Sequence, residues 1–354
     1  DITAKIPVND NITAVFGAEG DQAKEVHNDA ISGKGNMQVT KVNFTYTNGP
    51  VTAIVGKQGM AGAPWFADER ANGVVGIYNA GPVVLAAAHF DNSNGNALSS
   101  THDLIATSNA IGATPAATTK AIASVSLEDA DINALAVIAP NIAGSGLNAS
   151  LWYASISGIS AELAFNDAAD TVAEVAQIDA DSYSLGLDGK FGIIGVDARY
   201  TSTDYDATSA IAAVEDALSE DASLLKLVVS ADLGVATPYI GYGQTDKDQH
   251  VAGVDLTSDS DSKADFGGEI LSIDELADAN AYILGVTVPV GAVTLAAHYI
   301  DGDAVEGDVD YNEMYLGADY KMSKNFNIGA HFAKANVDVD GVSDTDYTDA
   351  AISL

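Results

Sequence analysis

The sequence lacks cysteine, has few basic residues and contains no long apolar run. Without a cysteine in 354 residues, the chain has neither disulfide bonds nor thiolate ligands for a metal. No apolar run approaches the about 18–20 residues that a membrane-spanning helix needs. No signal peptide is visible, and the chain opens on the strand-like stretch DITAKIPV, so we expect residues of the mature N-terminus to precede Asp1.

Basic residues are scarce, with 15 Lys and Arg against 50 Asp and Glu and a formal net charge of -35. This charge excludes a binder of nucleic-acid phosphates, because the two would repel each other. Since 47% of the residues are hydrophobic, the chain is not a disordered acidic protein either. A marine or salt-adapted source would explain much of the charge, and ion or ligand binding is the alternative.

Motifs of common enzymes are absent as well. The sequence contains no GxSxG, HExxH, P-loop or CxxC pattern. The six histidines are scattered and none pairs with another at metal-site spacing, although His298 and His331 fall on polar faces of expected strands. We therefore expect neither an enzyme nor a required cofactor.

What the sequence has in abundance is alternation of apolar and polar residues. In the stretch SYSLGLDGKFGIIGVDARY, Tyr183, Leu185 and Leu187 alternate with Ser184 and Gly186. About seventeen stretches of this kind, roughly seven to ten residues each, run from one end of the chain to the other. Two of them, LNASLWYASI and SAELAFND, are read as separate strands joined by a tight turn at Gly158. Strands that cross a membrane need about nine to eleven residues.

The connections between these stretches alternate between short and long. The short ones are rich in Gly, Asn, Asp and Pro, as tight hairpins require. The long ones are acidic and fall at residues 21–36, 92–130, 167–181, 202–223, 245–279, 301–310 and 336–346. In an antiparallel meander, this alternation places every long loop at one end.

The sequence thus predicts an all-β fold, an antiparallel up-and-down transmembrane β-barrel that forms a single domain over residues 1–354. We expect about 18 strands, the first of them not in the chain, with short periplasmic turns and long acidic extracellular loops with some helix. Helical spacing appears in TSAIAAVEDALSED and in SLEDADINALAVIAPNIAG, which opens with Ser126 and Asp129 as a capping box. Because a strand at residues 132–139 would break the loop alternation, we assign these residues to a loop.

The polar faces of the strands are rich in Gly, Ser, Thr and Ala besides charged residues, unlike the outer face of a soluble sandwich. We therefore expect the apolar faces to contact lipid and the polar faces to line water. Aromatic residues near strand ends fit membrane-interface girdles: Tyr46, Tyr78, Phe90, Tyr200, Tyr242 and Tyr299. The expected pore-lining residues on strands are Lys5, Lys41, Lys57, Asp188, Lys190, Asp197, Arg199, Lys226, Asp232, Glu313 and Asp319.

Residues 37–91 carry the stretch VNFTYTNGPVTAIVGKQGMAGAPWFADERANGVVGIYNAGPVVLAAAHFD, which resembles the major outer membrane porin of Campylobacter and its relatives. The likeness continues more weakly through YLGADYKMSKNFNIGAHF and DVDGVSDTDYTDAAISL. That family has a strand before the position of Asp1 and ends on an aromatic residue, whereas this chain stops at Leu354. The resemblance implies a homotrimer of barrels in the outer membrane of a Gram-negative bacterium. Each barrel would conduct ions and small hydrophilic solutes through a constriction formed by inward-folded loops.

The loop GMAGAPWFADERANG is the expected constriction, with Asp68, Glu69 and Arg70 facing the lumen and Trp65 and Phe66 anchoring the loop. A solvated turn with an ion pair is the alternative for this loop. Selectivity would come from pore width and lining charges, and the net negative charge favours mild cation preference. We expect membrane lipid, lipopolysaccharide and further copies of the chain as partners.

Another acidic loop, DLTSDSDSKADFGGE, offers carboxylates to calcium from Asp255, Asp259, Asp261, Asp265 and Glu269, although its spacing is not that of an EF-hand. A plain solvated loop is the alternative. For the whole chain, a second hypothesis is a structural or adhesive surface protein, S-layer-like or a β-sandwich, with calcium-binding loops. A third is a substrate-specific channel with lumenal aromatic residues in file, for which Tyr239 and Tyr315 are candidates.

Overall fold

The computed structural model describes most of the chain, with gaps that fall mainly in the long connections. The described residues are 2–20, 37–60, 62–66, 70–91, 100–104, 120–127, 130–167, 170–209, 215, 219–247, 254, 262–273, 276–304, 309–323, 326–339 and 345–353. Within these ranges, no helix is both long and apolar enough to cross a membrane.

Strands make up almost all of the regular structure. They are β1 (Ile2–Pro7), β2 (Ile12–Gly20), β3 (Met37–Asn48), β4 (Val51–Gly59), β5 (Arg70–Asn79), β6 (Val84–Asp91), β7 (Ser100–Leu104), β8 (Lys120–Ser126), β9 (Asp131–Ala139), β10 (Leu147–Asp167), β11 (Asp170–Phe191), β12 (Ile194–Thr208), β13 (Ala222–Ala231), β14 (Thr237–Thr245), β15 (Ala279–Val290), β16 (Val293–Ala304), β17 (Val309–Ser323), β18 (Phe326–Val339) and β19 (Thr345–Ser353). In the part of the chain that the structure describes, one 3-10 turn, η1 (Ile142–Gly144), lies between β9 and β10.

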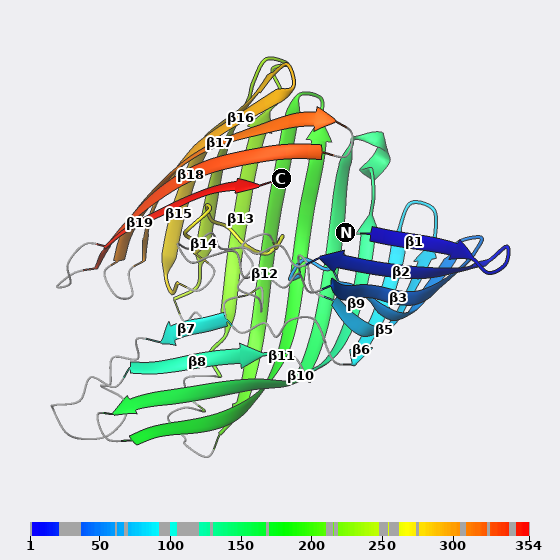
Figure 1. The fold of residues 1–354 in the computed structure, drawn as a ribbon, viewed down its shortest axis with the longest axis horizontal. Helices are drawn as coiled ribbons and strands as arrows, with labels where there is room; N and C mark the ends of the chain where they lie inside the picture. Colours follow the sequence, from blue (N-terminus) through cyan, green and yellow to red (C-terminus); the bar gives the residue numbers. More distant parts are fainter. Residues whose placement is uncertain are drawn as a thin grey trace.

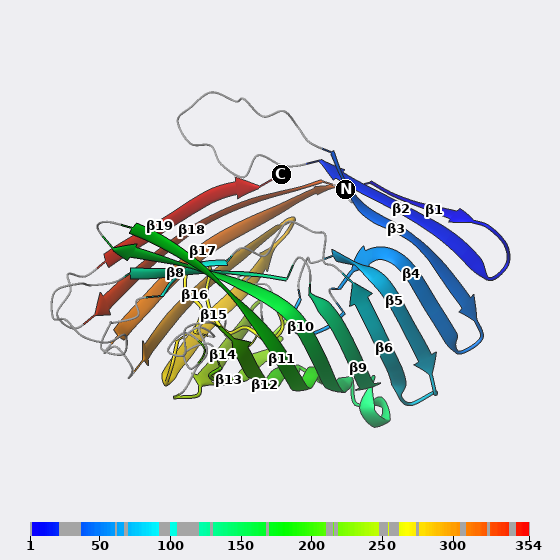
Figure 2. The same cartoon turned by 90° about the horizontal axis from the view of Figure 1, so that it is seen from below.

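The strands form one antiparallel up-and-down sheet, as the sequence predicts. Each of β1–β5 pairs with the next strand, β6 pairs with β9, and β9–β19 continue the series. The short strands β7 and β8 pair with each other, and β8 lies along the far half of β10 (Figure 1). Figure 2 shows the sheet curling strongly, so that β1 and β19 approach each other.

Two sequence predictions about this middle region are wrong. Residues 132–139 belong to strand β9, which pairs with both β6 and β10, and are not part of a loop. Residues 147–167, read as two strands joined by a tight turn, form the single strand β10. The expected turn is a β-bulge: Gly158 adopts a positive φ of 80°, which glycine tolerates, and the register shifts between Ile156 and Ile159.

The connections alternate in length as expected, but the strands extend further into the long ones. Short turns at residues 8–11, 49–50, 80–83, 140–146, 192–193, 232–236 and 291–292 all lie at one end of the sheet, here called the turn end. At the opposite loop end, β10 and β11 fill most of the expected loop 167–181, and β12 continues to Thr208. The helix expected in residues 126–144 is absent there, where β9 and η1 stand instead. The helix expected near residues 208–221 lies largely outside the described residues.

The outer face of the curved sheet is apolar and exposed. In register across three strands, Ile240, Leu284 and Tyr299 are 58%, 65% and 47% exposed. The same holds for most strands, including Leu185 on β11 and Leu227 on β13. Because no second sheet among the described residues packs on these side chains, the arrangement does not fit a β-sandwich.

Tyrosines border this apolar face at the loop end. Tyr153 and Tyr183 are cross-strand partners, as are Tyr242 and Tyr282, whose rings lie 5.0 Å apart. The hydroxyl groups of Tyr153, Tyr242 and Tyr299 donate to Asp181, Asn280 and Asp301. A row of tyrosines, each with an apolar ring and a polar hydroxyl group, is typical of a membrane interface. Phe90, expected in the girdle, is instead buried on the inner face, because it alternates with exposed Leu85 and His89.

The hydrophobic core lies on the inner face towards the loop end. There, segments 60–66 and 262–273 fold against the sheet and meet each other, with the N–H of Ala264 donating to the carbonyl of Pro64 at 3.0 Å. Phe266 and Ile273 pack above Gly243 of β14, where a β-carbon would lie only 2.4 Å and 2.7 Å from their side chains. The inner face is therefore partly filled by inward-folded loops.

Candidate functional site

The inward segment 60–66 is held by its two aromatic residues. Trp65 is completely buried and Phe66 nearly so, and the Trp65 ring meets that of Trp152 on β10 edge to face at 6.5 Å. Burying a side chain the size of Phe66 stabilises its position by about 1.5–3 kcal/mol. Both aromatic residues thus occupy the anchoring positions that the sequence indicates.

The charged end of the same loop is only partly described. Asp68 and Glu69 lie outside the described residues. The Arg70 guanidinium makes a bidentate ion pair with Glu19 of β2, with N–O distances of 2.7 Å and 2.8 Å. This ion pair spans β3 and β4, so it ties the end of the loop to β2. Glu19 thereby neutralises the charge of Arg70.

On β11–β13, four of the expected pore-lining residues lie on the inner face. The Arg199 guanidinium is buried over Gly186 and donates to the hydroxyl of Ser184 at 3.0 Å. A β-carbon at Gly186 would lie 2.7 Å from that guanidinium, so the glycine provides its space. Cross-strand from Arg199, Lys226 is nearly buried and pairs with Asp197 at 3.2 Å. Asp188 faces Asp197 in register and accepts from the Asn148 amide at 3.0 Å.

Lys190 and Asp232 lie at the turn end and form an exposed ion pair of 3.3 Å. Asp232 is not on a strand but opens the turn 232–236. The backbone N–H of Gly234 and then the Lys190 ammonium hold the pKa of Asp232 below its ordinary value. These two residues therefore mark the rim of the inner space rather than its middle.

Lys41 and Lys57, two further strand lysines of the expected lining, lie on opposite faces. Lys41 is on the inner face, where its side chain runs along Gly17. Lys57 stands in register with Val42, which is half exposed on the outer face, and lies on the same face as the exposed Val51 and Val55. The lining role expected for Lys57 is therefore wrong. A lysine at the loop end of an outer face can extend its ammonium to the membrane interface.

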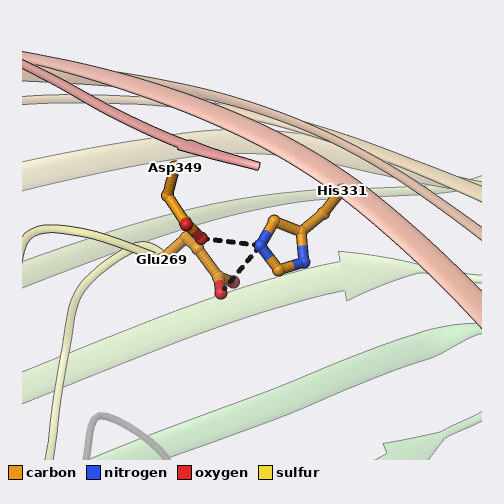
Figure 3. A group of neighbouring side chains, drawn as sticks. All are labelled: Glu269, His331 and Asp349. Atoms are coloured by element: carbon orange, nitrogen blue, oxygen red, sulfur yellow. Dashed lines mark hydrogen bonds and ion pairs between the residues drawn. The ribbon is translucent and has the colours of Figure 1, made fainter. Parts of the chain in front are cut away.

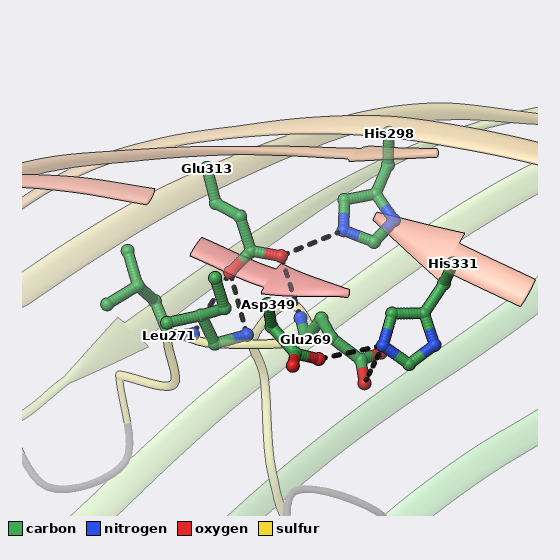
Figure 4. A network of polar contacts seen from close by, with 7 residues as sticks. Glu269, Leu271, His298, Glu313, His331 and Asp349 are labelled. Carbon is green, nitrogen blue, oxygen red and sulfur yellow. Dashed lines mark hydrogen bonds and ion pairs between the residues drawn. The ribbon is translucent and has the colours of Figure 1, made fainter. Parts of the chain in front are cut away.

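Glu313 on β17 is fully buried and anchors the second inward segment (Figure 4). Its carboxylate accepts hydrogen bonds from the backbone N–H groups of Glu269, Ile270 and Leu271 at 2.7–3.0 Å. The His298 ring lies 3.4 Å from the same carboxylate. A single side chain thus positions a whole turn of segment 262–273 above the wall.

Beside Glu313, an aromatic row crosses the inner face. Tyr239, Gly285, His298 and Tyr315 are in register on β14–β17. The Tyr315 ring stacks on His298 at 4.7 Å and on His331 of β18 at 5.9 Å. The hydroxyl end of Tyr239 folds over Gly285, which leaves room for it.

His331 ends this row and meets two carboxylates (Figure 3). Its Nε2 lies 2.7 Å from Asp349 of β19 and 3.4 Å from Glu269 of the inward segment. The sequence predicts no cluster of these three residues, because a loop residue and residues of two strands meet only after folding. Strand pairing could have suggested the contact of His331 with Asp349, because the two residues lie on neighbouring strands of one hairpin. Its register places Ala333 opposite Asp349, one inner-face position from His331.

Most of the loop expected to bind calcium lies outside the described residues. Asp255, Asp259 and Asp261 lie outside the described residues. Asp265 is buried and accepts a hydrogen bond from the Ser272 hydroxyl, within the packed part of segment 262–273. Asp265 therefore helps to shape this segment.

Taken together, the inner face offers charged, hydroxyl and aromatic groups, narrowed by two anchored segments, while the outer face is apolar. Such an arrangement suits a lined passage through an apolar medium.

Comparison with known proteins agrees with this geometry. A family model for Gram-negative porins matches residues 120–340. Among solved structures, Pseudomonas aeruginosa OccK9 (OpdG) is similar with a TM-score of 0.58 and 13% identity, covering 99% of this chain and 88% of that chain. P. aeruginosa OpdK with vanillate gives 0.57 at 13% identity, covering 96% of this chain and 86% of that one.

P. aeruginosa OccD3 (OpdP) gives 0.58 at 12% identity, covering 96% of this chain and 81% of that one. At such identities the likeness concerns the fold. No curated protein matches the chain. Because the family model spans more than half of the sequence, the chain belongs to the Gram-negative porins, outer-membrane channel proteins rather than enzymes.

Proposed function

We propose that this chain is a passive diffusion channel for ions and small hydrophilic solutes. In this proposal the sheet closes between β1 and β19 into a single-domain barrel, with the short turns in the periplasm and the long loops outside the cell. The main support is the inverted distribution of side chains, with exposed Leu185 and Leu284 outside and Arg199 and Glu313 inside. In lipid every backbone amide must be paired, which favours a closed sheet.

The proposed selectivity is a mild preference for cations. In the described residues, Arg70, Lys190, Lys226 and Lys334 each pair with a carboxylate, which neutralises their charge. The net charge of -35 leaves a large acidic excess over such pairs. An acidic surface concentrates cations at the pore mouth and repels anions.

Conductance of the purified protein in planar bilayers tests this function. We expect ohmic single-channel steps, and a reversal potential in a salt gradient whose sign indicates cation preference. Absence of conductance from correctly folded protein would favour a surface-structural role, and an anion-selective reversal potential would contradict the charge argument alone. Folding is checked separately by heat-modifiable migration on a denaturing gel.

The constriction is proposed to be formed by segment 60–66 with Asp68, Glu69 and Arg70. Replacing the fully buried Trp65 by Ala removes the anchor, at a cost of about 3–5 kcal/mol for a large core side chain. We expect Trp65→Ala to raise single-channel conductance and its current noise. The matched control is Trp152→Phe, which keeps an aromatic partner in place; a Trp65→Ala channel with unchanged conductance would remove this segment from the constriction.

We further propose the assembly and setting implied by the resemblance to the major outer membrane porin of Campylobacter. These are a homotrimer in contact with lipid and lipopolysaccharide, in the outer membrane of a Gram-negative bacterium. Two proposals rest on the acidic residues instead: a marine or salt-adapted source, from the net charge, and calcium binding by Asp255, Asp259, Asp261 and Asp265, from their clustered carboxylates. Cross-linking in native membranes, with and without a calcium chelator, tests assembly and calcium dependence together.

A substrate-selective channel is the second candidate function. The aromatic row of Tyr239, His298, Tyr315 and His331 favours it, because stacked rings on a wall can guide flat solutes. The similar OpdK was solved with vanillate. Blocking of ion current by benzoate but not by acetate, lost in Tyr315→Ala, would support selectivity; equal effects of both acids would support the general channel.

A further inference from the structure

The cluster of Glu269, His331 and Asp349 joins three different elements at one point. Segment 262–273 contributes Glu269, β18 contributes His331 and β19 contributes Asp349. One ligand atom from each lies within 4.8 Å of the other two. His331 Nε2 is the shared centre, at 2.7 Å from Asp349 and 3.4 Å from Glu269.

This geometry matches the spacing of ligands around a small divalent ion. Zn²⁺ binds His nitrogen and carboxylate oxygen at about 2.0–2.2 Å, so ligand atoms around a tetrahedral ion lie about 3.4 Å apart. A single imidazole proton can bond well with only one carboxylate at a time, whereas a metal ion would bind all three groups. Small side-chain movements would bring the three atoms to that spacing.

Surrounding contacts hold two of the three ligands in place. The backbone N–H of Glu269 donates to Glu313 at 2.7 Å, which fixes the segment that carries the Glu269 carboxylate (Figure 4). The His331 ring is stacked on Tyr315, which is itself stacked on His298. Supporting contacts of this kind orient metal ligands and raise affinity.

The donor set also selects among metals. One imidazole and two carboxylates suit borderline transition-metal ions such as Zn²⁺. Calcium prefers six to eight oxygen ligands and gains little from an imidazole. Asp349 is half exposed on the inner face, which leaves a side open for water as a further ligand.

We propose that Glu269, His331 and Asp349 form a binding site for a divalent transition-metal ion, of which Zn²⁺ is the representative, on the inner wall of the sheet. The ion ties the inward segment 262–273 to β18 and to β19, which pairs with only one neighbour in the described residues. It also neutralises two carboxylates. If the chain conducts as proposed above, bound Zn²⁺ lowers both its cation preference and its current.

The test is Zn²⁺ binding to the full-length, detergent-purified protein after treatment with a chelator, measured by equilibrium dialysis and isothermal titration. We expect one strong site per chain, weakened at least tenfold in each of His331→Asn, Asp349→Asn and Glu269→Gln. Weak binding to other acidic residues is measured as the background in the variant that combines all three substitutions. A tenfold excess of Ca²⁺ should not displace the strongly bound Zn²⁺.

The matched control is His89→Asn. His89 also pairs with a carboxylate, Asp91 at 2.7 Å, but its other partner is the uncharged Asn133, and it faces outward from β6. This variant should bind Zn²⁺ as the unaltered chain does. Equal strong binding by the unaltered chain and by His331→Asn, no strong binding at all, or displacement by Ca²⁺ would overturn the site.

Binding and conduction are separate readouts. Zn²⁺ binding without channel activity would leave the metal site standing and reject the proposed function. Channel activity without strong Zn²⁺ binding would support the proposed function and reject the metal site. Current reduced by Zn²⁺ in the unaltered chain but not in His331→Asn supports both proposals.

Discussion

Glu313 has no exposed surface, and three backbone N–H groups converge on its carboxylate. A buried charge is tolerated only where such donors compensate for lost hydration. Here the donors come from a loop and not from the wall, so the carboxylate determines where that loop lies. Glu313 thus holds one inward-folded segment against the wall.

Replacing Glu313 by Gln removes an acceptor, because an amide nitrogen cannot accept from Ile270 and Leu271. Each buried donor left without a partner costs about 1–3 kcal/mol. We expect Glu313→Gln to lower the urea midpoint of the micelle-bound protein and to increase proteolysis near residue 270. The exposed Asp346, paired with Lys334, provides the control: Asp346→Asn should leave the urea midpoint almost unchanged. Equal midpoints for both variants would refute the anchoring role.

Asp232 gives the turn end a dependence on pH. Its pKa is lowered in the folded state by the Gly234 N–H and by Lys190. A depressed carboxyl pKa stabilises the fold above the unfolded value of about 3.9, and this stabilisation is lost as pH falls through the folded pKa. Asp232→Asn should therefore lower the unfolding temperature slightly at pH 7 and hardly at all near pH 2. A difference that grows in acid would have the wrong sign.

At this scale, the face on which a strand residue lies was readable from the sequence, because period two fixes it. Arg199, Lys226 and Asp197 are on the inner face for that reason. Lys57 was misplaced through attention to its charge, although its spacing of two residues from Val55 places both side chains on the outer face. Contacts between a loop and a strand, such as that of Glu269 with His331, depend on chain closure over many residues and have no local signal.

Among the elements, β9 and β10 show where pattern reading fails. The sequence count of about seventeen strands agrees with β1–β6 and β9–β19, but two errors cancel within it: β9 was missed and β10 was counted twice. Gly158 looked like a hairpin turn because glycine serves both turns and bulges. Only the pairing of β10 with both β9 and β11 distinguishes the two.

A charge on the outer face of β15 should be costly if that face meets lipid. Arg or Lys at the membrane midplane of a barrel costs about 2–4 kcal/mol. We expect Leu284→Arg to reduce the free energy of unfolding in phospholipid vesicles by about this amount. Thr287→Arg, on the inner face of the same strand, should cost less than about 1 kcal/mol. Similar losses for both variants would indicate that the two faces have similar surroundings.

For the molecule as a whole, the apolar face of the sheet points to lipid and the polar face to water, the reverse of a soluble protein with a dry core. Apolar residues such as Leu185 and Leu284 point outwards, and charged residues such as Asp188 share the inner face with small ones such as Thr287. The family membership and the curled sheet agree with this arrangement (Figure 2). A large acidic charge and a large apolar content coexist in one chain because the charged residues face water and the apolar residues face lipid.

Site-directed spin labelling tests this claim most directly, and the absence of native cysteine allows single labels without other changes. Labels at Leu185→Cys and Leu284→Cys, in vesicles, should collide readily with oxygen dissolved in lipid and poorly with a water-soluble nickel chelate. Labels at Asp188→Cys and Thr287→Cys should show the opposite preference. Labels at Leu185 and Leu284 that are shielded from both reagents, as between two packed sheets, would contradict the account.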